Sequence, residues 1–140
     1  MDPEDIKHLR RTWARVVSES QVFGFLFYER LFTLAPETRT LFPRSLDVQG
    51  QKLFQTLNWI VANIDDTERV LAEARELAIR HIGYGVEAGD YPAVGEALVS
   101  AMDRGLETGL SEAEAAAWQR AYAVLSGAMI AAAYPDGAGG

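Results

Sequence analysis

The sequence predicts an all-α fold, and three observations support this. Apolar residues recur at spacings of three and four along nearly the whole chain, which is the period of an amphipathic helix. No segment shows the strict apolar–polar alternation of a half-buried strand. The prolines lie outside the expected helix interiors, where they would break backbone hydrogen bonds. We therefore expect a fold made of helices alone.

The first part of the chain contains two long helices and a short one. An aspartate cap followed by proline is a common start signal, so Asp2 and Pro3 open the first helix. A second helix is expected from about Val22 to Leu34. A short, turn-like helix then runs from Pro36 to Phe42.

The next helix is expected to begin at Ser45 or Asp47. Its inward stripe follows helical spacing and contains Gln49, Leu53, Leu57, Ile60 and Ile64. A polar break follows, and Thr67 is a candidate cap for the helix that leads to His81. Glycines then interrupt the pattern at positions 83, 85 and 89.

Two further helices complete the prediction. One restarts at Asp90–Pro92 and continues to about Gly109. Ser111 and Glu114 have the spacing of a capping box for the last helix, which should stop before Pro135. We expect residues 1–135 to form a single domain and residues 136–140 to be a disordered tail.

Composition narrows the function classes. With 140 residues, 49% of them hydrophobic, the chain can bury the core of one domain. A net charge of −7 with dispersed basic residues argues against nucleic-acid binding. The absence of cysteine excludes disulfides, thiolate zinc sites and iron–sulfur clusters. A charged N-terminus and the lack of a long apolar run predict a cytoplasmic protein that has no membrane partner.

His81 is the main candidate functional residue, because the chain has only two histidines. It shares an apolar helix stripe with Leu77 and Ala78, where a neutral imidazole could ligate a metal held by something other than protein. A core histidine satisfied by a neighbouring carbonyl fits the same pattern. His8 lies among charged residues and is expected at the surface. No phosphate-binding loop or hydrolase motif is present, and two histidines cannot form a multi-histidine metal site.

Four segments together resemble a known family. These are FYERLFTLAPETRTLF at 27–42, QGQKLF at 49–54, RHIGYGVEAGDYPAVGEAL at 80–98 and AWQRAYAVL at 117–125. In order and content they resemble the bacterial single-domain globins, the branch of Vitreoscilla-type haemoglobin and the haem domain of flavohaemoglobins. The resemblance covers nearly the whole chain and implies a globin fold of seven to eight helices that sandwich one haem b.

The resemblance also implies a role for individual residues. His81 would be the proximal iron ligand, with its second ring nitrogen donating to the carbonyl of Leu77. On the distal side, Tyr28, Gln49 and Leu53 would face the bound gas. The expected cofactor contacts are Phe42, Leu53, Arg80, Val86 and Tyr91. Alternatives remain: Tyr28 as an ordinary buried tyrosine, Gln49 as a surface amide and Arg80 as a solvated charge.

The implied function is reversible oxygen binding with high affinity, for storage or carriage. The alternative is a nitric oxide dioxygenase that uses an external reductase, with weak peroxidase side activity; a globin-fold interaction module without haem is a third option. In the flavohaemoglobin branch a tyrosine and a glutamate support the proximal histidine. Here Tyr91 matches the tyrosine, but Ala133 stands at the place of the acid, which puts enzymatic turnover in doubt.

The expected partners are dioxygen, other diatomic gases and a reductase. A monomer and a homodimer are both compatible with the sequence. In the ferric state, water, Gln49 or Tyr28 could each occupy the sixth coordination position.

Overall fold

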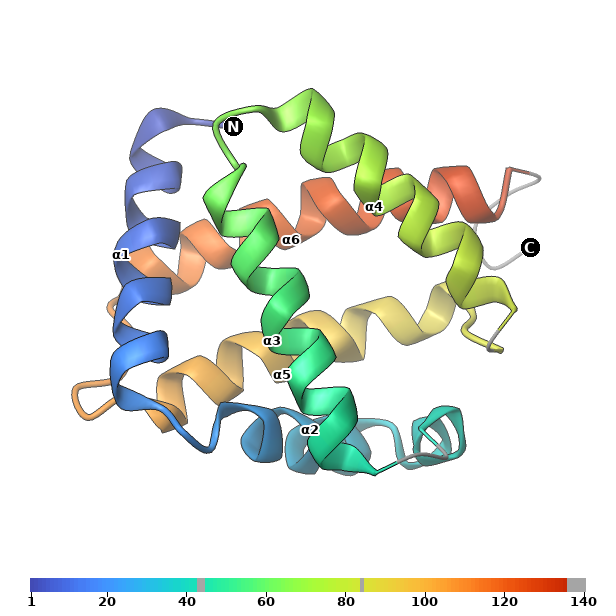
Figure 1. The fold of residues 1–140 in the computed structure, drawn as a ribbon, viewed down its shortest axis with the longest axis horizontal. Coiled ribbons are helices and arrows are strands. Elements are labelled where there is room, and N and C mark those ends of the chain that lie inside the picture. The colour runs from blue at the N-terminus through green and yellow to red at the C-terminus, as the bar shows by residue number, and fades with distance from the viewer. Residues whose placement is uncertain (43–44, 84, 136–140) are drawn as a thin grey trace.

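The computed structural model describes residues 1–42, 45–83 and 85–135, and these residues form helices without any strand (Figure 1). The all-α prediction is therefore confirmed, while the expected tail at 136–140 lies outside the described residues. The α-helices are α1 (Pro3–Glu19), α2 (Phe23–Leu34), α3 (Leu46–Ala62), α4 (Thr67–Ile82), α5 (Tyr91–Gly105) and α6 (Glu112–Ala133). Two short 3-10 helices, η1 (Pro36–Leu41) and η2 (Ala88–Asp90), precede α3 and α5.

Predicted caps open three of the six α-helices, α1, α3 and α6. The side chain of Asp2 accepts a hydrogen bond from the backbone N–H of Glu4 at 2.8 Å, with Pro3 at the first helical position. Ser111 and Glu114 form the expected capping box at the start of α6, each side chain accepting from the other's backbone N–H. Ser45, the first of the two candidates, caps α3.

Two predicted boundaries are wrong. Asp66, and not Thr67, caps α4, because the Asp66 carboxylate accepts from the backbone N–H of Arg69 at 3.3 Å and Thr67 is already helical. Helix α5 ends at Gly105, since Leu106 has an extended backbone. Gly109 instead lies in the turn before α6 with φ 68°, a conformation that favours glycine.

The helices pack in crossed pairs around one core. Helix α2 lies along α5, α4 lies along α6, and α1 crosses α6 (Figure 1). Helix α3 crosses α2, and their backbones approach closely at Gly24 and Gly50: a Cβ added to Gly24 would lie 3.4 Å from the Cα of Gly50. Only small residues permit this approach. The core side chains include Leu9, Val16, Phe23, Leu31, Ala97 and Met102.

Helices α3 and α4 leave their short connection in different directions (Figure 1). Helix α3 runs across α2 and packs on α2 and α1, whereas α4 packs on α6. Helices α3 and α4 therefore pack mainly on different partners.

Candidate functional site

His81 lies in the last turn of α4, and one of its ring nitrogens has a defined role. Its Nδ1 lies 2.6 Å from the carbonyl oxygen of Leu77, as expected from the sequence. Because a carbonyl oxygen can only accept, the proton of this bond belongs to Nδ1, and in the neutral ring the lone pair is then on Nε2. This tautomer suits an imidazole that ligates a metal through Nε2.

His81 is less buried than a histidine in the core of the protein would be. Ala78 is fully buried, whereas Leu77 and His81 are only half-buried and Arg80 is exposed. The stripe that carries His81 is thus beside the core and is not enclosed by the described residues. His8, expected at the surface, is half-buried, because it lies in α1 within the face that borders buried Leu9 and Thr12.

The segment after His81 is held at Val86. The backbone N–H of Val86 donates to the carbonyl of His81 at 3.2 Å. The carbonyl of Val86 accepts a hydrogen bond from the hydroxyl of Tyr134, which follows α6. Gly85 has φ 92°, so this tight return of the chain favours glycine. The half-buried Val86 therefore connects the His81 turn to the end of α6.

Tyr28 is packed by aromatic rings on three sides. It is 4% exposed, with ring centroids 4.9 Å from Phe27, 5.9 Å from Phe32 and 5.1 Å from Phe42. Burial raises the pKa of Tyr28 to about 12, so the hydroxyl stays protonated and remains a donor. Among the residues that the structure describes, no side chain or carbonyl accepts this hydroxyl.

Two further predicted residues lie on α3 near its crossing with α2. Gln49 directly precedes Gly50, and Leu53 follows one turn later on α3. Gly24, which meets Gly50, lies one turn before Tyr28 on α2. Gln49 and Leu53 are both half-buried, so a polar and an apolar side chain lie together near this crossing.

The remaining predicted cofactor contacts have different surroundings. Phe42 is half-buried and packs on Tyr28 and Phe32. Arg80 is exposed and forms no ion pair with any described residue. Tyr91 is buried, and its hydroxyl has no hydrogen-bond partner among the described residues. Burial raises the pKa of Tyr91, and nearby Tyr134 and Asp90 raise it further.

These donors fit a haem better than a metal bound by protein alone. In the described part of the chain, no cluster of three or more His, Cys, Asp and Glu side chains could hold an ion. A metal at His81 would need its other ligands from a cofactor, as in haem. Such a flat, largely apolar group suits the residues present. These are the imidazole of His81, the apolar side chains of Phe42 and Leu53, and the phenol of Tyr28.

The family comparison identifies the fold. The Globin family model matches residues 26–129, which include Tyr28, Gln49 and His81. The chain belongs to the globin family. This match confirms the predicted fold and the predicted resemblance. Membership of the family implies haem-based gas binding.

The relatives of this globin include animal and bacterial proteins. It is 27% identical to the Globin-2 A chain of Anadara inaequivalvis over 87% of this chain and 89% of that protein. It is 31% identical to a flavohemoprotein of Halalkalibacterium halodurans over 74% of this chain, and 30% identical to one of Rhizobium meliloti over 71%. The aligned part spans 26% of each flavohemoprotein. None of the described helices combines the length and apolar character needed to cross a membrane.

Two features of the site were missed by sequence reasoning. Tyr134 was not predicted, although an aromatic residue directly before Pro135 at the end of the last helix was a visible signal. Phe32 was also missed as a neighbour of Tyr28, because its position one turn later on α2 does not reveal the ring orientation.

Proposed function

We propose that this globin binds dioxygen and related diatomic gases reversibly and with high affinity, using haem b. The observation that carries the proposal is the bond between Nδ1 of His81 and the carbonyl of Leu77 at 2.6 Å. It orients the ring and leaves Nε2 as the nitrogen with the lone pair. Haem, when bound, would supply the iron that binds the gas.

Each predicted side chain has a role in this proposal. His81 holds the iron, while Phe42, Leu53 and Val86 supply apolar contacts to the ring. Arg80 would pair with a carboxylate of the cofactor, and Tyr91 would support the proximal histidine. In the ferric protein, water, Gln49 or Tyr28 would be a further ligand of the iron.

The high affinity follows from the distal donors. Tyr28 is buried and its hydroxyl stays protonated. This hydroxyl lacks an acceptor among the described residues, so it can donate to a ligand without breaking another hydrogen bond within the protein. A hydrogen bond to a charged group contributes about 1.5–3 kcal/mol. If the bond exists only in the complex, release slows roughly ten- to hundredfold.

A second candidate function is nitric oxide dioxygenation with an external reductase. The similarity to two flavohemoproteins favours it. Ala133, buried at the place where that branch carries an acid, weighs against efficient turnover and leaves only weak peroxidase side activity. Tyr91 consequently lacks the carboxylate that would support the proximal histidine in that branch.

Spectra and turnover separate these options. We expect the purified protein to show a Soret band with distinct ferric, ferrous and carbonyl forms, and stopped-flow mixing to give slow oxygen release. Absence of haem binding would support the interaction-module option. Sustained nitric oxide consumption with a cellular reductase and NAD(P)H would favour the enzyme; a single reaction of the oxygenated protein would not, because it needs no reductase.

A further inference from the structure

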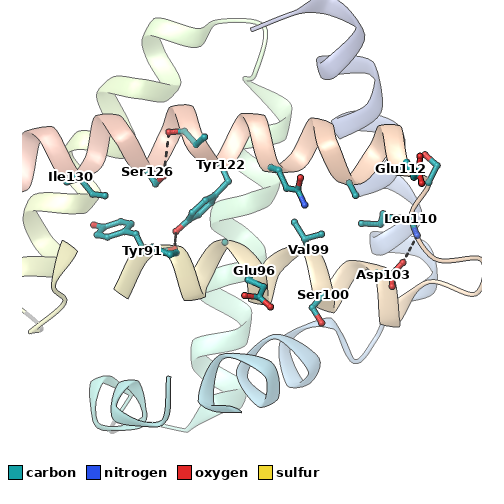
Figure 2. A pocket seen from close by; sticks show the side chains of 16 residues that line it. Tyr91, Glu96, Val99, Ser100, Asp103, Leu110, Glu112, Tyr122, Ser126 and Ile130 are labelled. Carbon is teal, nitrogen blue, oxygen red and sulfur yellow. Dashed lines mark hydrogen bonds between the residues drawn. The ribbon is translucent and has the colours of Figure 1, made fainter. Parts of the chain in front are cut away.

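A groove of about 760 Å³ lies between α5 and α6 (Figure 2). Tyr28, Gln49 and His81 do not line it, and Tyr91 is the one predicted cofactor contact among its lining residues. Its apolar lining includes Val99, Leu110, Ala115, Tyr122, Ala123 and Ile130. The groove is open to solvent along the two helices, which gives it the shape of a docking surface and not of an enclosed ligand cavity.

The packing of Tyr122 fixes the floor of this groove. The ring of Tyr122 lies against Gly95, where an added Cβ would come within 2.6 Å of the ring carbons. Its hydroxyl donates to the carbonyl of Tyr91 at 2.7 Å (Figure 2). The ring is therefore held at both ends. The lining side chains that are exposed to solvent include Glu96, Asp103, Gln119 and Ala123.

The charged side chains that line the groove are acidic. Among the described residues, three carboxylates line it, those of Glu96, Asp103 and Glu112, and no Lys, Arg or His does. Arg30 pairs with Glu96 at 2.9 Å, which neutralises the middle of the groove. The negative charge is therefore concentrated at the end formed by Asp103 and Glu112, where the α5–α6 connection lies.

We propose that this groove docks an amphipathic helix of a partner protein that carries an apolar face and basic residues at one end. The apolar face would cover Val99 and Tyr122, and the basic end would lie beside Asp103 and Glu112. Helix α5 has 15 residues and is roughly 22 Å long, so it offers about four turns of contact.

Charge favours this occupant over a second copy of the chain. In a two-fold dimer the same patch meets itself, so the carboxylates of both copies would share one interface. Like charges at a desolvated interface disfavour association. The net charge of −7 also repels a second copy, whereas it attracts a basic segment.

The test uses a fluorescently labelled amphipathic helical peptide of leucine and lysine, titrated into the holoprotein and followed by anisotropy. The controls are a scrambled peptide of the same composition and a peptide with glutamate in place of lysine. We expect binding of the amphipathic basic peptide alone. Amide chemical-shift changes should fall on residues that line the groove, such as Val99, Leu110 and Tyr122.

Paired variants test whether the groove is the site that binds the peptide. Ala123→Trp places a large ring in the groove from an exposed position. Its control, Ala72→Trp, places the same ring at an exposed position of α4 outside the groove. Glu112→Lys and Glu68→Lys each reverse an exposed first-turn acid of a helix, but only Glu112 lines the groove. We expect affinity to fall about tenfold in Ala123→Trp and roughly three- to tenfold in Glu112→Lys, with both controls unchanged.

Several outcomes would overturn the proposal. One is equal loss of affinity in each variant and its control, which means general attraction to an acidic protein. Another is a set of chemical-shift changes outside the groove. A third is a concentration-dependent wild-type dimer that Ala123→Trp abolishes, since the groove would then be occupied by a second copy.

Discussion

The hydroxyl of Tyr134 donates a hydrogen bond to the carbonyl of Val86, and this bond links the end of α6 to the segment that follows His81. The N–H of the same residue, Val86, donates to the carbonyl of His81 at 3.2 Å. The turn that carries the proposed iron ligand is therefore held by a residue at the end of α6, the helix that packs on α4. This arrangement makes Tyr134 a positioning residue for His81.

Tyr134→Phe should loosen the proximal segment. The variant loses one hydrogen bond, so the free energy of unfolding should fall by about 0.5–1.5 kcal/mol. Haem should transfer to an excess of an acceptor apoprotein faster than from wild type, because the His81 turn is less restrained. Urea unfolding and the rate of haem transfer measure the two effects.

Tyr122→Phe is the matched control, because the Tyr122 hydroxyl also donates to a backbone carbonyl, that of Tyr91. It should reduce the free energy of unfolding by a similar amount while leaving haem transfer nearly unchanged. Equal acceleration of haem transfer in both variants would assign a purely structural role to Tyr134.

Tyr28→Phe should speed oxygen release more than Gln49→Leu. The ring of Tyr28 is already fixed by Phe27, Phe32 and Phe42, whereas Gln49 must order three torsions to reach a ligand. We expect roughly a ten- to hundredfold faster release for Tyr28→Phe, from a bond of about 1.5–3 kcal/mol. Stopped-flow release of oxygen provides the measurement.

Carbon monoxide is the control ligand for this comparison, since it gains less negative charge on binding and benefits less from a donor. Its release should change much less in both variants. Equal effects on the two gases would indicate steric access in place of hydrogen bonding, and a larger effect at Gln49 would reverse the ranking of the donors.

Alkaline pH should destabilise the protein partly through Tyr28. Burial raises the pKa of Tyr28 from 10.0 to about 12, so between these values the unfolded chain releases a proton that the folded protein retains. The free energy of unfolding attributable to Tyr28 is therefore intact below pH 10 and falls as pH rises toward 12. Urea unfolding across this window should give a shallower decline for Tyr28→Phe than for wild type. Parallel curves would contradict the assigned burial effect.

Ala133→Glu should restore a proximal acid. The Tyr91 hydroxyl is buried and has no hydrogen-bond partner among the described residues, and Tyr91 lines the same groove as Ile130 near the end of α6 (Figure 2). If the new carboxylate accepts from Tyr91, the haem potential should shift downward. Ala132→Glu, one residue earlier on α6, tests the effect of charge alone. An unchanged potential in folded Ala133→Glu would show that position 133 does not face Tyr91.

Local signals predicted the helices well, because caps act within a few residues. Asp2 with Pro3 and Ser111 with Glu114 were correct for this reason. Thr67 was wrong because two adjacent residues, Asp66 and Thr67, could both serve as caps, and the sequence does not show which side chain turns back to the helix.

Contacts between distant segments could not be predicted in the same way. The Leu77 acceptor was predictable because it lies one helical turn before His81. The bond from Tyr134 to Val86 joins residues 48 positions apart and depends on how α6 packs on α4. The α5–α6 groove likewise depends on Tyr122 resting on Gly95, a relationship without a local pattern.

The absorption spectrum of His81→Ala tests the central claim most directly. We predict that the folded variant, verified by circular dichroism, loses haem or binds it weakly, whereas His8→Ala keeps the wild-type Soret band and carbonyl complex. His81→Gly should regain a ferrous carbonyl spectrum when imidazole is added, because free imidazole can replace the missing ligand. A His81→Ala protein with a wild-type Soret band and carbonyl complex would contradict the assignment of His81 as the iron ligand.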